Sequence, residues 1–152
     1  MIFLAAVLLG LLVGFLWKGK ITGLTNMALR STWLLFIFLA IDVFMNSRFS
    51  SPLASEAMRW SVLVLLSLQY GSLFLLILFN RKRWPLLVVG AGECFNFLVI
   101  MFNNGRMPVD MAGLPESARL QALRAGQVPH YGALSSATNL PYLGDIIPFR
   151  LF

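Results

Sequence analysis

Charged side chains are scarce in this 152-residue chain, where Asp, Glu, Lys and Arg make up only 12% of the residues. Soluble globular domains carry about 25% of such residues, so this scarcity, together with 59% hydrophobic residues, excludes that class. Cysteine and histidine occur once each, as Cys94 and His130. One cysteine forms no intrachain disulfide, and one histidine without a Cys/His cluster predicts neither a metal nor a haem site. Motifs for a catalytic nucleophile or a phosphate-binding glycine loop are absent too, so we expect no cofactor.

The chain does contain long apolar runs, and its four tryptophans stand at their ends. Indole rings settle at the headgroup level of a bilayer, where the ring and its N–H are both satisfied. The pattern predicts an all-α fold, an integral membrane four-helix bundle over residues 1–104, with spans at about 2–17, 33–46, 61–79 and 84–103. We read the first run as a retained helix and not a signal peptide, because no Lys or Arg precedes Lys18.

The basic residues, which give a formal net charge of +6, predict the orientation of these spans. The loops after the first and third spans carry six Lys or Arg residues, whereas the loop after the second carries two. The positive-inside rule then predicts that both termini are extracytoplasmic, in a bacterial cytoplasmic membrane. The aromatic residues lie within apolar runs and not among the basic ones, so nucleic acid is not an expected partner.

Two acids interrupt the apolar runs, Asp42 in the second and Glu93 in the fourth. A charge inside a bilayer is costly, so each is a functional hypothesis. Both lie nine residues from the cytoplasmic end of their span, about 13–14 Å deep. Gln69 and Asn96 lie at similar depth, so the four can form a polar cluster. No span contains Lys, Arg or His, so the acids are protonated, bind a cation or proton in transit, or meet a second protein; a hydrogen-bonded cluster that fixes helix packing is the simplest interpretation.

Small residues recur every four positions in the first run, at Ala6, Gly10 and Gly14. Such a stripe lets another helix approach closely, either within this chain or at a dimer face. Residues 105–152 form an extracytoplasmic or interfacial segment with a different composition. A short helix is expected at about Pro115–Ala125, and the apolar tail Ile146–Phe152 is expected to dock on an apolar surface.

The most distinctive string is Asn103-Asn-Gly-Arg-Met-Pro-Val109. Asn-Gly favours a tight turn and Met-Pro ends a helix, while Arg106 is placed to reach a lipid phosphate or an acid such as Asp145. This string, with His130, the Leu134–Thr138 stretch and Leu-Gly-Asp-Ile-Ile-Pro148, resembles a bacterial family of small multi-pass membrane proteins of unknown function. The resemblance implies no activity. The candidate residues at this outer surface are Asn104, Gly105, Arg106, Pro108, His130, Gly144 and Asp145.

Three functions compete on these observations. A non-catalytic accessory or assembly subunit of a larger membrane complex explains the acids without partners, the small-residue stripe and the apolar tail. A small proton- or cation-linked carrier or channel would use Asp42 and Glu93. An enzyme with His130, Asp145 and Arg106 at the outer surface ranks last. The expected partners are the lipid bilayer and other membrane protein subunits.

Overall fold

The computed structural model describes residues 12–16, 18, 28–112, 114 and 116–145. The chain divides into two compact parts, one formed by Met1–Arg30 and a larger one that begins at Ser31. In the smaller part, residues 12–16 are helical, and this stretch contains Gly14. The rest of the expected first span, with Ala6 and Gly10, lies outside the described residues, as does the expected docking tail 146–152.

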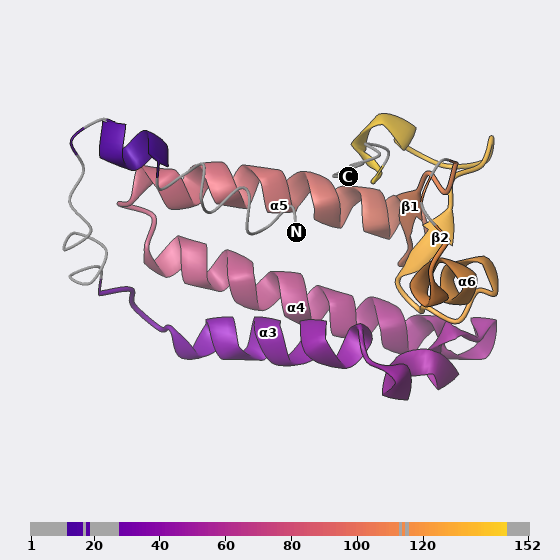
Figure 1. The fold of residues 1–152 in the computed structure, drawn as a ribbon. Helices are drawn as coiled ribbons and strands as arrows, with labels where there is room; N and C mark the ends of the chain where they lie inside the picture. Colours follow the sequence, from indigo (N-terminus) through magenta and orange to yellow (C-terminus); the bar gives the residue numbers. More distant parts are fainter. Residues whose placement is uncertain (1–11, 17, 19–27, 113, 115, 146–152) are drawn as a thin grey trace. The chain divides into compact units, whose positions relative to one another are not determined.

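Three apolar helices form the body of the larger part: α3 (Trp33–Met45), α4 (Arg59–Phe79) and α5 (Trp84–Phe102). They lie side by side, each running opposite to the one before it, with α4 packed against both of the others (Figure 1). Each helix begins and ends within two residues of the predicted range. The long apolar runs therefore predict the positions of these helices well, because apolar runs of this length are typical of helices and too long for strands.

Only two of the described helices are long and apolar enough to cross a membrane, namely α5 and the stretch Glu56–Phe79 that contains α4. Helix α3 has 13 residues and so covers about 20 Å, less than the ~30 Å of a bilayer core. It is long and apolar enough to cross a membrane only together with the 3-10 helix η1 (Arg48–Ala54), from which it is bent by 76°. The described residues therefore support two spans, or three if the bent pair is one span. Most of the expected first span lies outside the described residues, so the prediction of four spans stays a prediction.

The core of the larger part lies along α4, which buries one or two residues in each turn. One cluster joins α4 to α3 around Leu73 and Leu76. A second cluster, around Val62 and Leu66, joins α4 to the end of α5. The remaining members of these clusters are Leu34, Ile77, Met45 and Ile100.

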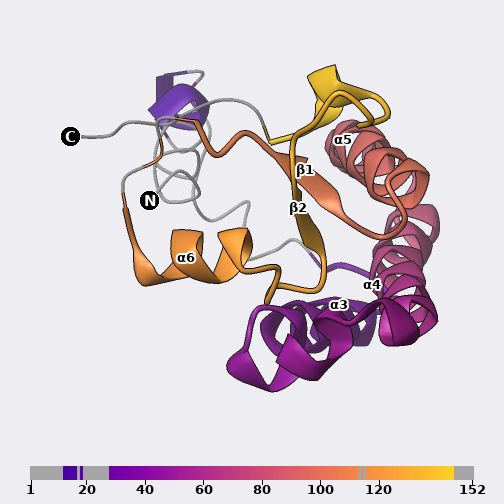
Figure 2. The ribbon, with the colours of Figure 1, turned by 90° about the vertical axis from the view of Figure 1, so that its right-hand side faces the viewer.

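A compact cap, formed by residues 103–145, lies at the end of the helices where α5 terminates. It contains a two-stranded parallel sheet of β1 (Met107–Val109) and β2 (Tyr131–Ala133), seen side by side in Figure 2. The connection between the strands holds the short helix α6 (Ala118–Arg124), and the 3-10 helix η3 (Pro141–Leu143) follows β2. Strands were not predicted, because three-residue strands are too short to show an alternating pattern.

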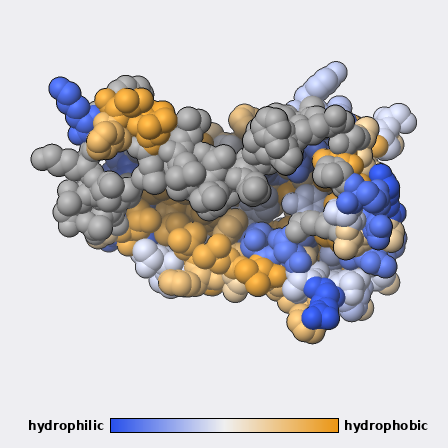
Figure 3. Space-filling view, in the orientation of Figure 1, coloured by the Kyte–Doolittle hydropathy of each residue, from blue (hydrophilic) through white to orange (hydrophobic). Residues whose placement is uncertain are grey.

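Helix α6 lies within the range where the sequence predicts a short helix, although it begins at Ala118 and not at Pro115. Its start is fixed by Ser117, whose side-chain oxygen accepts a hydrogen bond from the backbone N–H of Leu120. Its end is marked by Gly126, which has a φ of 66° and follows the last turn. Hydrophilic residues gather over the cap, whereas hydrophobic residues cover the helices next to it (Figure 3).

Candidate functional site

The two sequence motifs meet at β1, which is the central strand of the cap. On one side β1 pairs with β2, and the backbone N–H of Met107 donates to the carbonyl of His130 over 2.8 Å. On the other side Val109 forms a bridge with Asp145. The N–H of Asp145 donates to the carbonyl of Pro108 over 2.8 Å. The residues expected to act together at one surface are therefore neighbours in one backbone ladder.

Proline is tolerated in this central strand because its neighbour Asp145 needs only a carbonyl acceptor from Pro108. Pro108 lacks an N–H, so it can serve the ladder only through its carbonyl oxygen. That oxygen meets Asp145, the residue that follows Gly144. A Cβ added to Gly144 would lie 2.9 Å from the same oxygen, so only glycine allows the two segments to approach so closely. The Gly-Asp dipeptide thus fits against Pro108 by shape.

The Asn-Asn-Gly stretch ends α5 and turns the chain into β1. Asn104 and Gly105 both have positive φ, 56° and 76°. The N–H of Gly105 donates to the carbonyl of Ile100 over 2.8 Å, which closes the last helical turn. The side chain of Asn103 also binds the backbone of Asn139 through two hydrogen bonds of 2.8 Å. Its Nδ2 donates to the carbonyl of Asn139, and its Oδ1 accepts from the N–H of Asn139. This stretch is therefore a helix stop that also anchors the chain segment before η3.

Arg106 follows the stop and takes part in a charged network that sequence reasoning missed. Its Nη2 pairs with Oε1 of Glu56, from the 3-10 helix η2 (Glu56–Met58). The other oxygen of Glu56 lies 4.0 Å from Nε of Arg59, the first residue of α4. Gly132 makes room for this arrangement, since a Cβ there would meet Arg106 Cδ at 3.3 Å. Arg106 was expected to reach a lipid phosphate or an acid such as Asp145, and the acid that it pairs with in the described part of the chain is Glu56.

Arg59 is the buried member of this network, with only 5% of its surface exposed. Its Nη1 donates to the carbonyl of Pro129 over 2.9 Å, which links the start of α4 to the segment before β2. His130, also buried, packs against the ring of its neighbour Tyr131, with 4.5 Å between the ring centroids and an interplanar angle of 45°. The sequence signal for this position is a basic residue directly before the boundary tryptophan Trp60.

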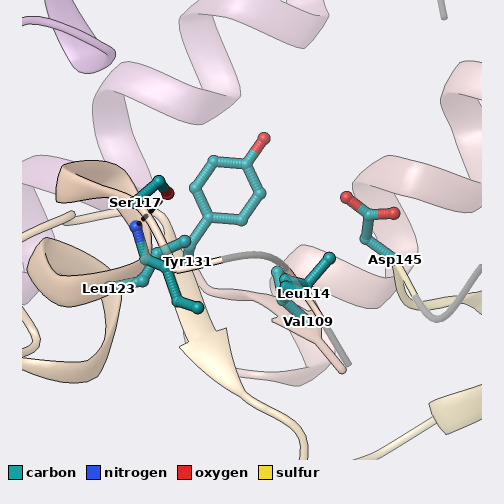
Figure 4. A pocket seen from close by; sticks show the side chains of 7 residues that line it. Val109, Leu114, Ser117, Leu123, Tyr131 and Asp145 are labelled. Atoms are coloured by element: carbon teal, nitrogen blue, oxygen red, sulfur yellow. Dashed lines mark hydrogen bonds between the residues drawn. The ribbon is translucent and has the colours of Figure 1, made fainter. Parts of the chain in front are cut away.

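A shallow hollow of about 270 Å³ lies on another side of the cap, between β1 and α6. Tyr131 and Asp145 approach it from opposite sides (Figure 4). Leu120 and Leu123 contribute apolar walls from α6, and Val109 and Leu114 add further apolar side chains. Ser117, the N-cap of α6, is a polar lining residue. Asp145 thus lines this hollow, whereas Arg106 pairs with Glu56. His130, Asp145 and Arg106 therefore do not converge on a single point of the cap.

The four polar residues of the apolar helices divide into two hydrogen-bonded pairs. Gln69, buried on α4, donates its amide to Oδ1 of Asp42 on α3 over 3.3 Å. On α5, Asn96 hydrogen-bonds Glu93 one turn away. The first pair joins two helices, whereas the second lies within one helix. The expected single cluster is therefore two separate sites, since α3 and α5 lie on different sides of α4 (Figure 1).

These features define a class: a small, mostly helical chain with two described helices that are long and apolar enough to cross a membrane. Within that class, the chain belongs to the family of unknown function called DUF5317, which matches residues 26–152. No curated protein and no solved structure matches the chain. An unknown-function family agrees with the resemblance seen in the sequence.

Proposed function

We propose that this chain is a non-catalytic subunit of a larger membrane protein complex, embedded as a four-helix bundle with its cap on the outer side. The observation that carries the proposal is the position of Glu93. It is an acid near the middle of α5, and the α5 sequence contains no Lys, Arg or His. Its hydrogen-bond partner, Asn96, is neutral and belongs to the same helix. A carboxyl group at that depth is costly, so a donor from another protein would stabilise it.

The surroundings of Glu93 support a helix–helix contact at this place. In the apolar stretch of α5 only 11% of the residues are buried, whereas 44% are buried in the apolar stretch that contains α4. Gly92, next to Glu93, would have open space around an added Cβ, so a second helix could come close there. The exposed side chains that flank this position on α5 are Val88, Val89, Phe95 and Leu98.

The test is purification of the tagged full-length protein from its native membranes in a mild detergent, followed by identification of stoichiometric partners. Glu93→Gln keeps shape and hydrogen bonding, whereas Glu93→Leu removes both. We expect Glu93→Gln to retain the partner and Glu93→Leu to weaken the complex by about 1 kcal/mol for each lost hydrogen bond. Val88→Leu, an apolar exchange on an exposed side chain of the same helix, is the matched control and should retain the partner.

Two outcomes would contradict the proposal. A monodisperse protein without stoichiometric partners would contradict a role as a subunit of a complex. Equal retention in Glu93→Gln and Glu93→Leu would show that its hydrogen bonds do not matter for assembly. The carrier hypothesis makes a different prediction, because a proton- or cation-linked path needs the charge of Asp42 and Glu93. Loss of transport in Glu93→Gln, with an intact lone protein, would favour the carrier.

A further inference from the structure

We infer that Arg59 and Arg106 form a binding site for a phosphate oxyanion at the cap end of the helices, with Glu56 as the internal group that an incoming anion displaces. The guanidinium group of Arg59 has more buried donors than hydrogen-bond acceptors around it. Its Nη1 is satisfied by the carbonyl of Pro129, but Nε and Nη2 are buried and meet no hydrogen-bond partner among the residues that the structure describes. Buried donors without acceptors are destabilising, and more so when they are charged.

The two unsatisfied groups have a specific geometry. Nε and Nη2 share one edge of the planar guanidinium, and their N–H bonds are parallel. That edge matches two oxygens of a single phosphate or carboxylate, which it binds in a bidentate manner. An isolated donor could be satisfied by any acceptor, whereas this edge favours one oxyanion. The side chain of Arg59 is therefore held in place by Pro129, while its recognition edge has no hydrogen-bond acceptor among the described residues.

Charge and access both fit an anion at this edge. Two arginines face one glutamate, so the network carries a formal charge of +1. Glu56 is the exposed acid next to this edge, and its Oε2 lies 4.0 Å from Nε, too far for a hydrogen bond. The side chain of Glu56 is 69% exposed and that of Arg106 is 38% exposed, so both can move without disturbing the core. Rotation of Glu56 would let an oxyanion lie between the two guanidinium groups.

Phosphate is the oxyanion expected at this level of the molecule. Arg59 directly precedes Trp60, which is 79% exposed and marks the start of the apolar run of α4. In the membrane placement of the proposed function, this is the level of lipid headgroups. The same chemistry would also accept free inorganic phosphate from solution. The lipid source rests on that placement, whereas the oxyanion site itself does not.

The test uses the full-length protein in a phosphate-free glycoside detergent. Its thermal unfolding is followed while inorganic phosphate is added, with sodium chloride at equal ionic strength as the reference. A second series adds phosphatidylglycerol or a glycosyl diacylglycerol that lacks phosphate. We expect saturable stabilisation by at least one of the phosphate compounds. Stabilisation by phosphatidylglycerol alone identifies a headgroup, and stabilisation by inorganic phosphate identifies a free anion; both support the site.

Variants separate the site from a general salt effect. Arg59→Lys keeps the charge but loses the bidentate edge, so the affinity for phosphate should fall about tenfold, as expected for one lost charge-assisted hydrogen bond. Glu56→Gln removes the competing carboxylate, so phosphate should bind several-fold more tightly. The matched control is Glu116→Gln, which removes the carboxylate of the exposed Glu116–Arg124 pair in the same cap and should change nothing.

The inference would be overturned if chloride reproduced the stabilisation, or if neither phosphate compound stabilised the wild type and Glu56→Gln. It would also be overturned if Glu56→Gln and Glu116→Gln bound phosphate equally. If Arg59→Lys does not fold, the comparison of these two glutamate variants still decides. Loss of the partner complex in Glu93→Leu would bear only on the proposed function, so the two proposals can fail separately.

Discussion

At the scale of single residues, the junction between α5 and the cap depends on Gly105. Its φ of 76° lies in the left-handed region, and it is buried against α4. A Cβ at this position would lie 3.1 Å from Cδ2 of Leu63. Gly126 offers a natural comparison, since its φ of 66° is similar but an added Cβ would meet nothing within 4 Å. The two glycines therefore separate backbone strain from crowding.

We expect Gly105→Ala to be clearly more destabilising than Gly126→Ala. Both substitutions place alanine in the left-handed region, at a cost of about 1–2 kcal/mol. Only Gly105→Ala adds a close contact with Leu63, for roughly another 1 kcal/mol. Thermal unfolding of the two variants in the same detergent, with wild type alongside, measures the difference. Equal midpoints would show that Leu63 moves aside without cost.

At the scale of elements, the sequence located helices far better than strands. The positions of α4 and α5 follow from runs of apolar residues and from the proline at the start of α5. The position of β1 could not be predicted, because Met-Pro-Val reads as a helix stop and the strand is defined only by its neighbours. Those neighbours are Tyr131–Ala133 and Asp145, which are distant in sequence.

The candidate site likewise has a part that the sequence predicts and a part that depends on tertiary structure. The sequence predicts that Arg106 and His130 lie at an outer surface, whereas His130 is buried in the cap. The sequence does not connect Arg106 with Glu56 or Arg59. Such a network depends on where η2 and α4 begin relative to the cap, which is a tertiary property. Likewise, helical rise predicts an equal depth for Asp42 and Glu93, whereas it does not predict which helices are neighbours.

The short helix α6 allows a prediction at this scale. Its N-cap Ser117 accepts the N–H of Leu120 over 3.1 Å, so Ser117→Ala should destabilise the cap by about 1 kcal/mol. Ser117→Asp retains an acceptor at the same position and should restore the stability. Hydrogen exchange of the amides of residues 118–124, measured by mass spectrometry, reports the local effect. Similar exchange in the Ala and Asp variants would contradict the capping role.

At the scale of the whole molecule, aromatic and basic residues mark the two ends of the larger part. Trp33 and Trp84 lie at the end opposite the cap, near the basic stretch Arg81–Arg83, and both are exposed. Trp60 lies at the cap end and is exposed as well. Indole rings at both ends of apolar helices are typical of a membrane boundary. The proposed orientation places the cap outside and the basic stretch in the cytoplasm.

This orientation predicts which positions an impermeant thiol reagent can reach. In a background in which the exposed Cys94 is replaced by alanine, single cysteines are introduced at Ser55, Ala118 and Lys82, all of them exposed. We expect labelling of Ser55→Cys and Ala118→Cys in intact cells without an outer-membrane barrier. Lys82→Cys should react only after the membrane is permeabilised. The opposite pattern would show that the molecule is inserted the other way round.

The central position of β1 also sets the order in which the molecule can be completed. Its partners lie 24 residues away, from Met107 to Tyr131, and 36 residues away, from Val109 to Asp145. Closing such long loops costs chain entropy before the hydrogen bonds of the ladder can form, so this ladder forms late in folding. During synthesis, β1 keeps an open edge until Asp145 has emerged from the ribosome. A chain that is cut short before that residue therefore exposes an unpaired strand, which quality-control proteases can recognise while the helices are already formed.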